Sequence, residues 1–343
     1  MYPISFGSDN HSGIHYKVFS SLQQANVGFC PAYGDDALTD RILSEIEALF
    51  GGDCTAWFVI TGTGANVVSL QNFLRSYHAV FCANSSHINV DECGAVQKFT
   101  QARLKVIDTP DGKLTPELIE PKLLTNRDQH HSQGRVVSIA QSTEYGTLYT
   151  LEELKALADF AHQHEMFLHI DGARLANAAA ALDCSLQAMT KDIGADIVSF
   201  GGAKNGLLFG EAIISFCPQI TADMRFYRKQ ASQLFSKMRF IAAQYEAYLD
   251  QDLWLANARA ANSMTRLLAE KLKEFKQIKI TQPVLVNSLY AILPREITPA
   301  LQEKYHFYMW NEALNEVRLM CSFNTQVEQI EEFIEHLREL LAE

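Results

Sequence analysis

Short β-rich runs alternate with helical patterns through the first two-thirds of the chain, and this alternation restricts the possible folds more than any other feature. The expected strands are short apolar runs at residues 56–61, 79–82, 103–107, 135–140, 167–170 and 197–200. Helical patterns stand among them at 64–77, 116–124 and 151–164. Strands separated by helices of this length predict parallel βαβ units. We therefore expect an α/β domain whose mainly parallel sheet is covered by helices on both faces.

The last part of the chain has a different pattern. Residues 224–275 contain neither Pro nor Gly and predict an almost continuous helical stretch. Further strands are expected at 278–281, 288–293 and 316–321, and helices at 299–304 and 326–343. This mixture is typical of a small α+β domain. We place the boundary so that residues 1–249 form a large domain and residues 250–343 a small C-terminal one.

Composition and charge argue against several functional classes. Of the 343 residues, 48% are hydrophobic and 20% are charged, with a formal net charge of −11. This acidic balance disfavours nucleic acid and anionic membrane surfaces as partners. The sequence has no secretory signal pattern and no apolar run near the roughly 18 residues of a membrane-spanning helix. The seven cysteines are scattered without a CxxC pair, so we expect reduced thiols and a cytoplasmic protein.

Two loops that follow expected strands carry charged residues in unusual positions. Asp171 comes directly after an apolar run and before Gly172, which is a position where a carboxylate can point into the crevice at the sheet edge. Taken alone, the same position is more typical of a helix N-cap. Lys204 follows two glycines and has small, apolar neighbours. Lost solvation there lowers the pKa of a lysine and makes it a nucleophile and base, whereas the alternative is a solvated lysine in a surface turn.

A third loop, at residues 61–66, joins an expected strand to an expected helix. Gly62 permits close backbone approach, and the free N–H groups of the helix start and the Thr63 hydroxyl can hold a phosphate, although this pattern alone is weak. A lysine for a Schiff base, an acid for the ring nitrogen and an anion cradle are the groups that pyridoxal phosphate (PLP) requires. The combination predicts a PLP site with Lys204 as the attachment point, Asp171 on the ring nitrogen, and Gly62 and Thr63 at the phosphate.

The sequence also resembles a known family, the threonine aldolases and β-eliminating lyases of the fold-type I PLP enzymes. The resemblance covers most of the chain, and the Asp-Gly-Ala-Arg segment with a lysine about thirty residues later is its most specific part. The matching segments are Ser8-Asp9-Asn10, Tyr33-Gly34-Asp35-Asp36, the loop 61–66, Ser86-His87-Ile88 with Glu92, His169 to Arg174, Lys204 and Val317-Arg318.

This resemblance implies roles for further residues. His87 is expected to stack on the cofactor ring, although alone it would be taken as a surface histidine. Arg174, near the cofactor, and Arg318 are expected to bind the substrate carboxylate with their planar guanidinium groups, with a hydroxyl from Ser8 on the N-terminal arm. Arg318 has the alternative interpretation of an edge-strand charge. The family also implies a homo-oligomer, a dimer of dimers with shared active sites, and no metal.

The implied reaction is the cleavage of β-hydroxy-α-amino acids of the threonine, allo-threonine or phenylserine type to glycine and an aldehyde. The alternatives are another β-eliminating lyase or a racemase on the same scaffold, and a PLP-binding protein without catalysis is the least favoured. Glu144 replaces a histidine that many members carry for the β-hydroxyl proton. A buried carboxylate can accept that proton, but Glu144 can equally be a simple hydrogen-bond acceptor. The sequence around Lys204, Ala203-Lys204-Asn205-Gly206, also departs from the usual Ser-Lys-Gly.

A basic cluster stands at the start of the long helical stretch. It consists of Arg225, Arg228, Lys229, Lys237 and Arg239. We interpret most of it as a solvated helix face or as partners for the surplus acid, with Lys237 as a candidate anchor for the PLP phosphate.

Overall fold

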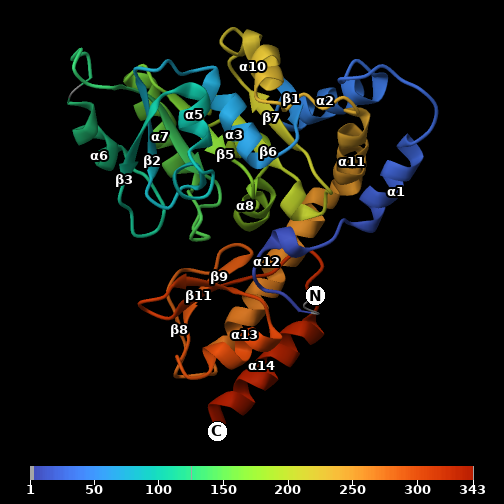
Figure 1. Cartoon of the computed structure of the whole chain (residues 1–343), viewed down its shortest axis with the longest axis vertical. Helices are drawn as coiled ribbons and strands as arrows, with labels where there is room; N and C mark the ends of the chain where they lie inside the picture. The colour runs from blue at the N-terminus through green and yellow to red at the C-terminus, as the bar shows by residue number, and fades with distance from the viewer. Residues whose placement is uncertain (1–3, 125, 343) are drawn as a thin grey trace.

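The structure is a computed structural model that describes residues 4–124 and 126–342. Figure 1 shows two parts, a larger one built on a twisted sheet and a smaller one that contains both ends of the described chain. The long helix α12 (Leu253–Leu272) runs from the larger part into the smaller.

The larger part is built on a sheet of seven strands within the described residues, in the order β1-β7-β6-β5-β4-β2-β3. The strands are β1 (Thr55–Val59), β2 (His78–Ala83), β3 (Arg103–Ile107), β4 (Gln133–Ala140), β5 (Phe167–Asp171), β6 (Ile197–Gly201) and β7 (Glu211–Ser215). Strands β2 to β6 pair in parallel, whereas β7 is antiparallel to both β6 and β1. The mainly parallel α/β sheet predicted from the sequence is therefore confirmed.

Strand β7 was not predicted from the sequence. It follows β6 after a connection of nine residues, which is too short for a parallel crossover and therefore returns the chain antiparallel. The connection turns at Gly206 and Gly210, whose φ angles of 113° and 106° are accessible to glycine but strained for other residues. This short connection carries Lys204.

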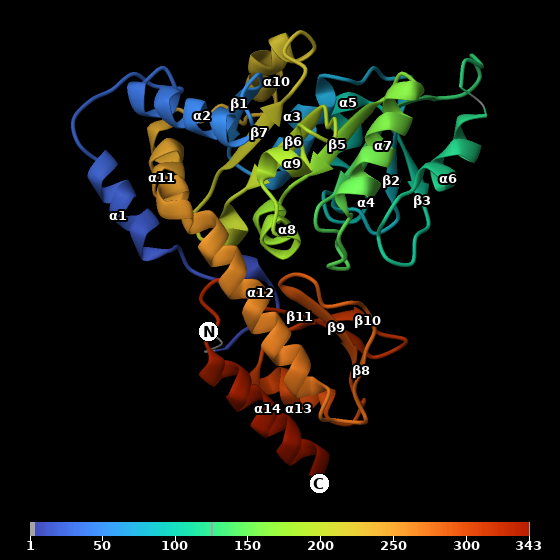
Figure 2. The ribbon, with the colours of Figure 1, turned by 180° about the vertical axis from the view of Figure 1, so that it is seen from behind.

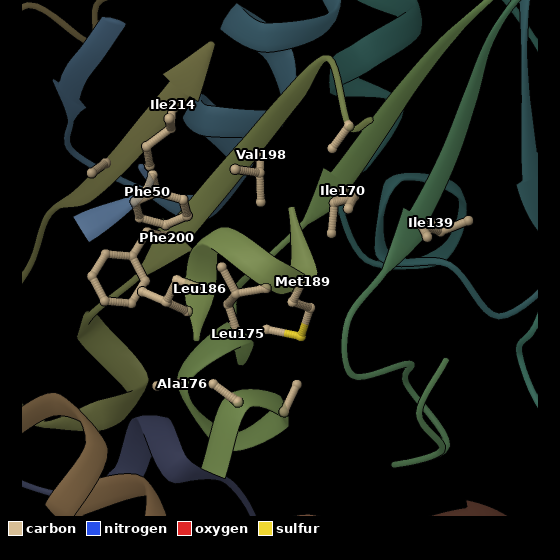
Figure 3. Packing of buried hydrophobic residues seen from close by; sticks show 14 of the residues in the cluster. Phe50, Ile139, Ile170, Leu175, Ala176, Leu186, Met189, Val198, Phe200 and Ile214 are labelled. Atoms are coloured by element: carbon tan, nitrogen blue, oxygen red, sulfur yellow. The ribbon is translucent and has the colours of Figure 1, made fainter. Parts of the chain in front are cut away.

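Helices cover both faces of the sheet, as the sequence predicts. One face packs against α3 (Gly62–Gln71), α5 (Ala95–Thr100) and α10 (Met224–Gln230). The other face packs against α2 (Ala37–Leu49), α6 (Pro116–Ile119), α7 (Leu151–Gln163), α8 (Leu175–Leu182), α9 (Leu186–Met189) and α11 (Arg239–Leu249). Figure 3 shows this second core, where Val198, Phe200 and Ile214 of the sheet meet Leu175 and Met189. Two short or peripheral helices complete this part, α1 (Tyr16–Ala25) and α4 (His87–Val90).

Helix α7 begins as the sequence predicts. The Thr150 hydroxyl accepts the Glu153 N–H at 3.2 Å, and the Glu153 carboxylate accepts the Thr150 N–H at 2.8 Å. This reciprocal capping box satisfies two N–H groups that have no partner inside the helix.

The single helical stretch expected at 224–275 is wrong in its continuity. The chain forms α10, α11 and α12 with two breaks between them. Ser232 lies in the first break with a φ of 60°, and Gln251 and Asp252 lie in the second with φ of 51° and 55°. In the first break, the Gln233 side chain accepts the Ile60 N–H at 3.0 Å beside the start of α3. Tertiary contacts of this kind override a helical pattern that contains no Pro or Gly.

The smaller part contains an antiparallel sheet in the order β10-β11-β9-β8. Its elements are β8 (Lys279–Ile280), β9 (Ser288–Ile292), β10 (Tyr308–Asn311), β11 (Glu316–Met320), α13 (Thr298–Lys304) and α14 (Val327–Ala342). Strand β10 was not predicted from the sequence, and Glu343 of the expected last helix lies outside the described residues. Figure 2 shows α12 and α14 packed beside this sheet.

The two parts have separate hydrophobic cores, but the chain crosses between them more than once. Ala258 of α12 packs in a core of the larger part and Leu268 in that of the smaller part. Ile4 and Phe6, from the start of the chain, also pack in the smaller core. The division into residues 1–249 and 250–343 stays a prediction.

Two further features concern membrane-spanning helices and the state of the cysteines. Within the described residues, no helix combines the length and apolar character needed to cross a membrane. All seven cysteines are described, and they are free thiols.

Candidate active site

The predicted site residues meet at the carboxyl ends of the central strands, in two adjoining hollows of about 40 and 350 Å³. Four residues line both hollows: His87, Glu144, Arg174 and Lys204. The inner hollow is also lined by Gly62, Asn66, Ala140, Ser142, Asp171 and Ala173, and the outer one by Ser8, Asn10, Asp91, Tyr308, Met309, Trp310 and Arg318. Loops after β2, β4, β5 and β6 supply most of the inner lining, which is where parallel sheets bind ligands.

Lys204 lies in a one-turn helix (Ala203–Asn205) in the short connection after β6. Burial, followed by the positive charge of Arg174, lowers the pKa of Lys204. The backbone just before Lys204 is held in place because the carboxylate of Glu211 on β7 accepts the Gly202 N–H at 3.0 Å. On its other side, the Asn205 side chain donates to the Tyr248 hydroxyl at 2.6 Å. Lys204 is therefore a desolvated amine on a rigid support, which is the state that a nucleophilic lysine requires.

Asp171 ends strand β5 and begins a hydrogen-bonded chain. The Asn66 side-chain nitrogen donates both to Asp171, at 2.8 Å, and to Glu92, at 2.7 Å. Glu92 in turn lies 2.9 Å from Nδ1 of His87. Burial by itself would raise the pKa of Asp171, but the Asn66 hydrogen bond and the positive charge of His87 outweigh it, and the pKa is lowered. A half-buried carboxylate is thus held in its ionised form.

His87 lies at the start of α4, on the wall of both hollows. The hydrogen bond with Glu92 is the main cause that raises the pKa of His87. This hydrogen bond to one ring nitrogen restricts the orientation of the imidazole. The expected stacking on a cofactor ring stays a prediction.

Glu144 lies in the loop after β4. Its Oε1 accepts the backbone N–H of His87 at 2.7 Å, and the Tyr290 hydroxyl donates to its backbone carbonyl. Burial, reinforced by the negative charge of Asp171, raises the pKa of Glu144 to about 7. A carboxyl with this pKa can take up and release a proton near neutral pH.

The structure brings both predicted arginines to the pocket but gives them different partners. Arg174 forms a bidentate pair with Asp9, at 2.7 Å from Nε and 2.9 Å from Nη2. Arg318 donates from Nη2 to the Gly7 carbonyl at 3.1 Å, and its guanidinium lies 5.3 Å from the Tyr308 ring centre and 5.4 Å from that of Trp310. Ser8 lines the outer hollow, and its hydroxyl accepts the Asn10 N–H at 3.2 Å.

The start of helix α3 supplies the candidate anion cradle. The Thr61 hydroxyl accepts the Gly64 N–H at 3.0 Å, and the earlier N–H groups of the first turn point out of the helix end. Gly62 lines the inner hollow, and a Cβ atom at Gly62 would meet no other atom within 4 Å. The space before this turn is therefore open to an anion. Thr63 is in the same turn but is not among the residues that line either hollow.

The basic cluster lies apart from this pocket. None of its five members lines either hollow. Arg228 packs on the Trp57 ring and donates to the Phe58 carbonyl, and Arg239 packs on the Phe240 ring. This placement agrees with a structural role for these two arginines, and nothing places Lys237 at the site.

Four residues that support the site were given no role from the sequence: Asp9, Asn66, Glu92 and Glu211. Asp9, Asn66 and Glu92 are polar residues of the segments that match the family, so the resemblance could have indicated them. Glu211 carried no comparable signal. The oxygen and nitrogen atoms of His87, Glu92 and Asp171 lie within 4.8 Å of one another, as metal ligands would. Glu92 contacts His87 directly and is linked to Asp171 through Asn66, and these hydrogen bonds hold the three residues together.

Comparisons with known proteins agree with this geometry. The family model described as beta-eliminating lyase matches residues 5–294. A low specificity L-threonine aldolase of Pseudomonas aeruginosa is 39% identical over 337 residues, which are 97% of this chain and 96% of that protein. A protein of the same description from another Pseudomonas strain is 36% identical and covers 98% of each chain. The solved structure of a Leishmania major threonine aldolase has a TM-score of 0.94 and 28% identity, covering 99% of this chain and 100% of that one.

Proposed function

Because this chain belongs to the β-eliminating lyase family, as its motifs indicated, we propose that it is a PLP-dependent aldolase. Its substrates are β-hydroxy-α-amino acids of the threonine, allo-threonine or phenylserine type, and its products are glycine and an aldehyde. The observation that carries the proposal is the meeting of Lys204, Asp171 and the start of α3 in one pocket. The names of the near-full-length relatives support the same activity.

The donor set of the pocket fits PLP. Lys204 would supply a desolvated amine for the cofactor aldehyde, and Asp171 would supply a half-buried, ionised carboxylate for the ring nitrogen. The open first turn of α3, with Gly62 and Thr63, would hold the phosphate, and His87 would lie against the ring. When bound, PLP supplies an electron sink that stabilises negative charge on the α-carbon of an attached amino acid.

The remaining residues of the pocket orient the substrate and move its proton. In this proposal Arg174, Arg318 and Ser8 bind the α-carboxylate, which fixes the direction of the substrate side chain. The Glu144 carboxyl, with its pKa near 7, accepts the β-hydroxyl proton as the bond between the α- and β-carbons breaks. His87 is held by Glu92 and presents its ring to the same space.

The outer hollow offers room for a β-substituent. Its wall includes Tyr308, Met309 and Trp310 of strand β10. The Trp310 ring packs edge-on against Tyr145 at 5.6 Å and Tyr290 at 5.1 Å between ring centres. This aromatic wall favours side chains larger than the methyl group of threonine, such as an aryl group.

The proposal is tested with a substrate panel on the purified, PLP-loaded protein. Release of glycine and an aldehyde is measured for L-threonine, L-allo-threonine and L-phenylserine, and we expect cleavage of at least one of them. Absorbance at about 420 nm, which is expected of a PLP–lysine Schiff base, should be lost in Lys204→Ala. Pyruvate and ammonia from serine or cysteine would instead identify a β-eliminating lyase, and change of configuration at the α-carbon a racemase. A protein that never binds PLP would refute the proposal.

We further propose that the protein acts in the cytoplasm as a homo-oligomer, a dimer of dimers with shared active sites. Its seven free thiols support the compartment. Exposed aromatic residues near the N-terminus support an assembly, among them Tyr16, Phe19 and Phe29, which are 72%, 52% and 108% exposed. Light scattering coupled to size-exclusion chromatography would measure the subunit number, and a monomeric mass would contradict the assembly.

A further inference from the structure

Asp9 is an almost completely buried carboxylate at the edge of the pocket. It is 1% exposed, and its oxygens accept hydrogen bonds from two side chains. Arg174 donates to both carboxylate oxygens of Asp9, and the Asn287 side chain donates to Oδ2 at 3.0 Å. Burial by itself would raise the pKa of Asp9, but the charge and hydrogen bonds of Arg174 outweigh it, and the pKa is lowered. Asp9 is therefore a fixed negative charge on a candidate substrate-binding arginine.

The segment that carries Asp9 is anchored in the smaller part of the protein. We call residues 6–9 the N-terminal strap. Phe6 is completely buried in the smaller core, its N–H donates to the His306 carbonyl at 2.8 Å, and its carbonyl accepts the Met320 N–H at 2.8 Å. A Cβ atom at Gly7 would lie 2.6 Å from a carbon of the His306 ring, so the strap lies too close to its neighbours for a side chain there.

The strap contacts both arginines that the site offers to a carboxylate. The Gly7 carbonyl accepts from Nη2 of Arg318, and Asp9 pairs with Nε and Nη2 of Arg174. Asn287, which also donates to the Cys321 carbonyl at 3.0 Å, ties Asp9 to the smaller part. One short segment thus sets the position of two cationic groups that come from different parts of the chain.

We propose that Asp9 is a positioning residue for the recognition of the substrate carboxylate by Arg174. This inference rests on the proposed function and adds to it a residue and a task. Asp9 occupies the Nε and Nη2 side of the guanidinium, and Nη2 also donates to Met320 Sδ at 3.4 Å. Among the described residues, this leaves the two N–H groups of Nη1 for a ligand. A guanidinium binds a carboxylate best when the two planar groups lie in one plane, so the orientation of the guanidinium decides the strength of binding.

The opposing effect of Asp9 is repulsion between its charge and the substrate carboxylate. Removing that charge relieves the repulsion but also releases Arg174, whose electrostatic neighbours include Glu144 and Tyr290. The side chain in Asp9→Asn has one acceptor oxygen in place of two and turns its N–H groups toward the guanidinium or toward Asn287, so the bidentate geometry is lost. Because a hydrogen bond to a charged group is worth about tenfold or more in affinity, loss of orientation is the larger effect.

The test compares ligands with and without a carboxylate on the PLP-loaded protein. Glycine and ethanolamine share the amine, but only glycine carries the carboxylate. Calorimetric titration of Asp9→Asn should show about tenfold weaker binding of glycine and less than about a twofold change for ethanolamine. The KM for the cleaved amino acid should rise by about the same factor as glycine binding weakens, with a smaller fall in kcat.

Asp36→Asn is the matched control. Asp36 is also a buried aspartate, 6% exposed, and its two oxygens accept the N–H and hydroxyl of Thr39 at the start of α2. Its substitution should lower the thermal unfolding midpoint and leave both ligand affinities unchanged. Equal weakening of glycine and ethanolamine in Asp9→Asn, or unchanged glycine binding, would overturn the proposal.

A second variant covers the case in which Asp9→Asn does not fold. Asn287→Ala keeps the ion pair and removes one donor from Asp9, so we expect about threefold weaker glycine binding and unchanged ethanolamine binding. Unchanged glycine binding in this variant would overturn the proposal. Wild-type protein that binds glycine but cleaves no β-hydroxy amino acid would refute the proposed function and leave the test of Asp9 valid. Wild-type protein that binds no glycine would overturn both.

Discussion

Replacing Glu144 by glutamine tests whether this residue handles the β-hydroxyl proton. With its pKa at about 7, the Glu144 carboxyl is about half ionised at pH 7, about 1% ionised at pH 5 and almost fully ionised at pH 9. If the ionised form is the proton acceptor, kcat/KM of the wild-type protein rises about 100-fold between pH 5 and pH 9. Most of that rise falls below pH 7, at about tenfold per pH unit.

In Glu144→Gln this dependence should disappear. Glutamine keeps the size of the side chain and can still accept the His87 N–H, but it cannot take up a proton. We expect kcat to fall by a factor of about 10 to 1,000 at pH 8, and kcat/KM to lose its rise between about pH 5 and 7. Steady-state glycine release over this pH range is the assay. A variant with the same pH profile as the wild type would refute the role of base and leave Glu144 as a hydrogen-bond acceptor.

Glu211→Gln is the control for this profile. Burial raises the pKa of Glu211 to about 8, but Glu211 does not line either hollow. Its substitution should leave the rise that is centred near pH 7 in place, whatever the overall rate. If the rise is lost in Glu211→Gln but persists in Glu144→Gln, the titrating group is Glu211 and the role proposed for Glu144 is wrong.

The same titration affects stability, and its sign follows from the direction of the shift. The folded-state pKa of Glu144, about 7, lies above the ordinary value of 4.5, so between these pH values the folded protein binds more protons than the unfolded chain. The contribution of Glu144 to the free energy of unfolding therefore falls as pH rises from about 4.5 to 7. Denaturant unfolding at several pH values should show a less negative slope in Glu144→Gln, and an unchanged slope would contradict this reasoning.

Three further substitutions test separate parts of the structure. Asp171→Asn should weaken PLP binding by about tenfold or more, because the ring nitrogen loses its ionised partner; equilibrium dialysis measures this, and unchanged affinity would count against that contact. Trp310→Ala should raise the KM for L-phenylserine more than that for L-threonine, and equal rises would remove Trp310 from side-chain recognition. Thr150→Ala should lower the free energy of unfolding by about 1 kcal/mol and leave kcat/KM unchanged, since it removes an N-cap remote from the pocket.

Local patterns predicted the elements whose causes are local. The strand at 103–107 has the predicted bounds, and the helix that begins at Leu151 starts where its capping box indicates. Strand β7 and the breaks around α11 were missed. The breaks depend on contacts with segments far away in the chain, such as the acceptance of the Ile60 N–H by Gln233. A strand paired on both sides, such as β7, obtains its hydrogen bonds from partners that a local pattern does not contain.

The sequence by itself determined the fold class and named the residues that could carry the chemistry, because alternating strands and helices force strand ends to one edge of the sheet. Lys204, Asp171, His87 and Glu144 do meet there. The tertiary structure decided what those residues are able to do. The pKa of Glu144 depends on burial and on Asp171, and the orientation of Arg174 depends on a carboxylate 165 positions away in the chain. Electrostatic and hydrogen-bonding states are set by neighbours in space, and only folding brings those neighbours together.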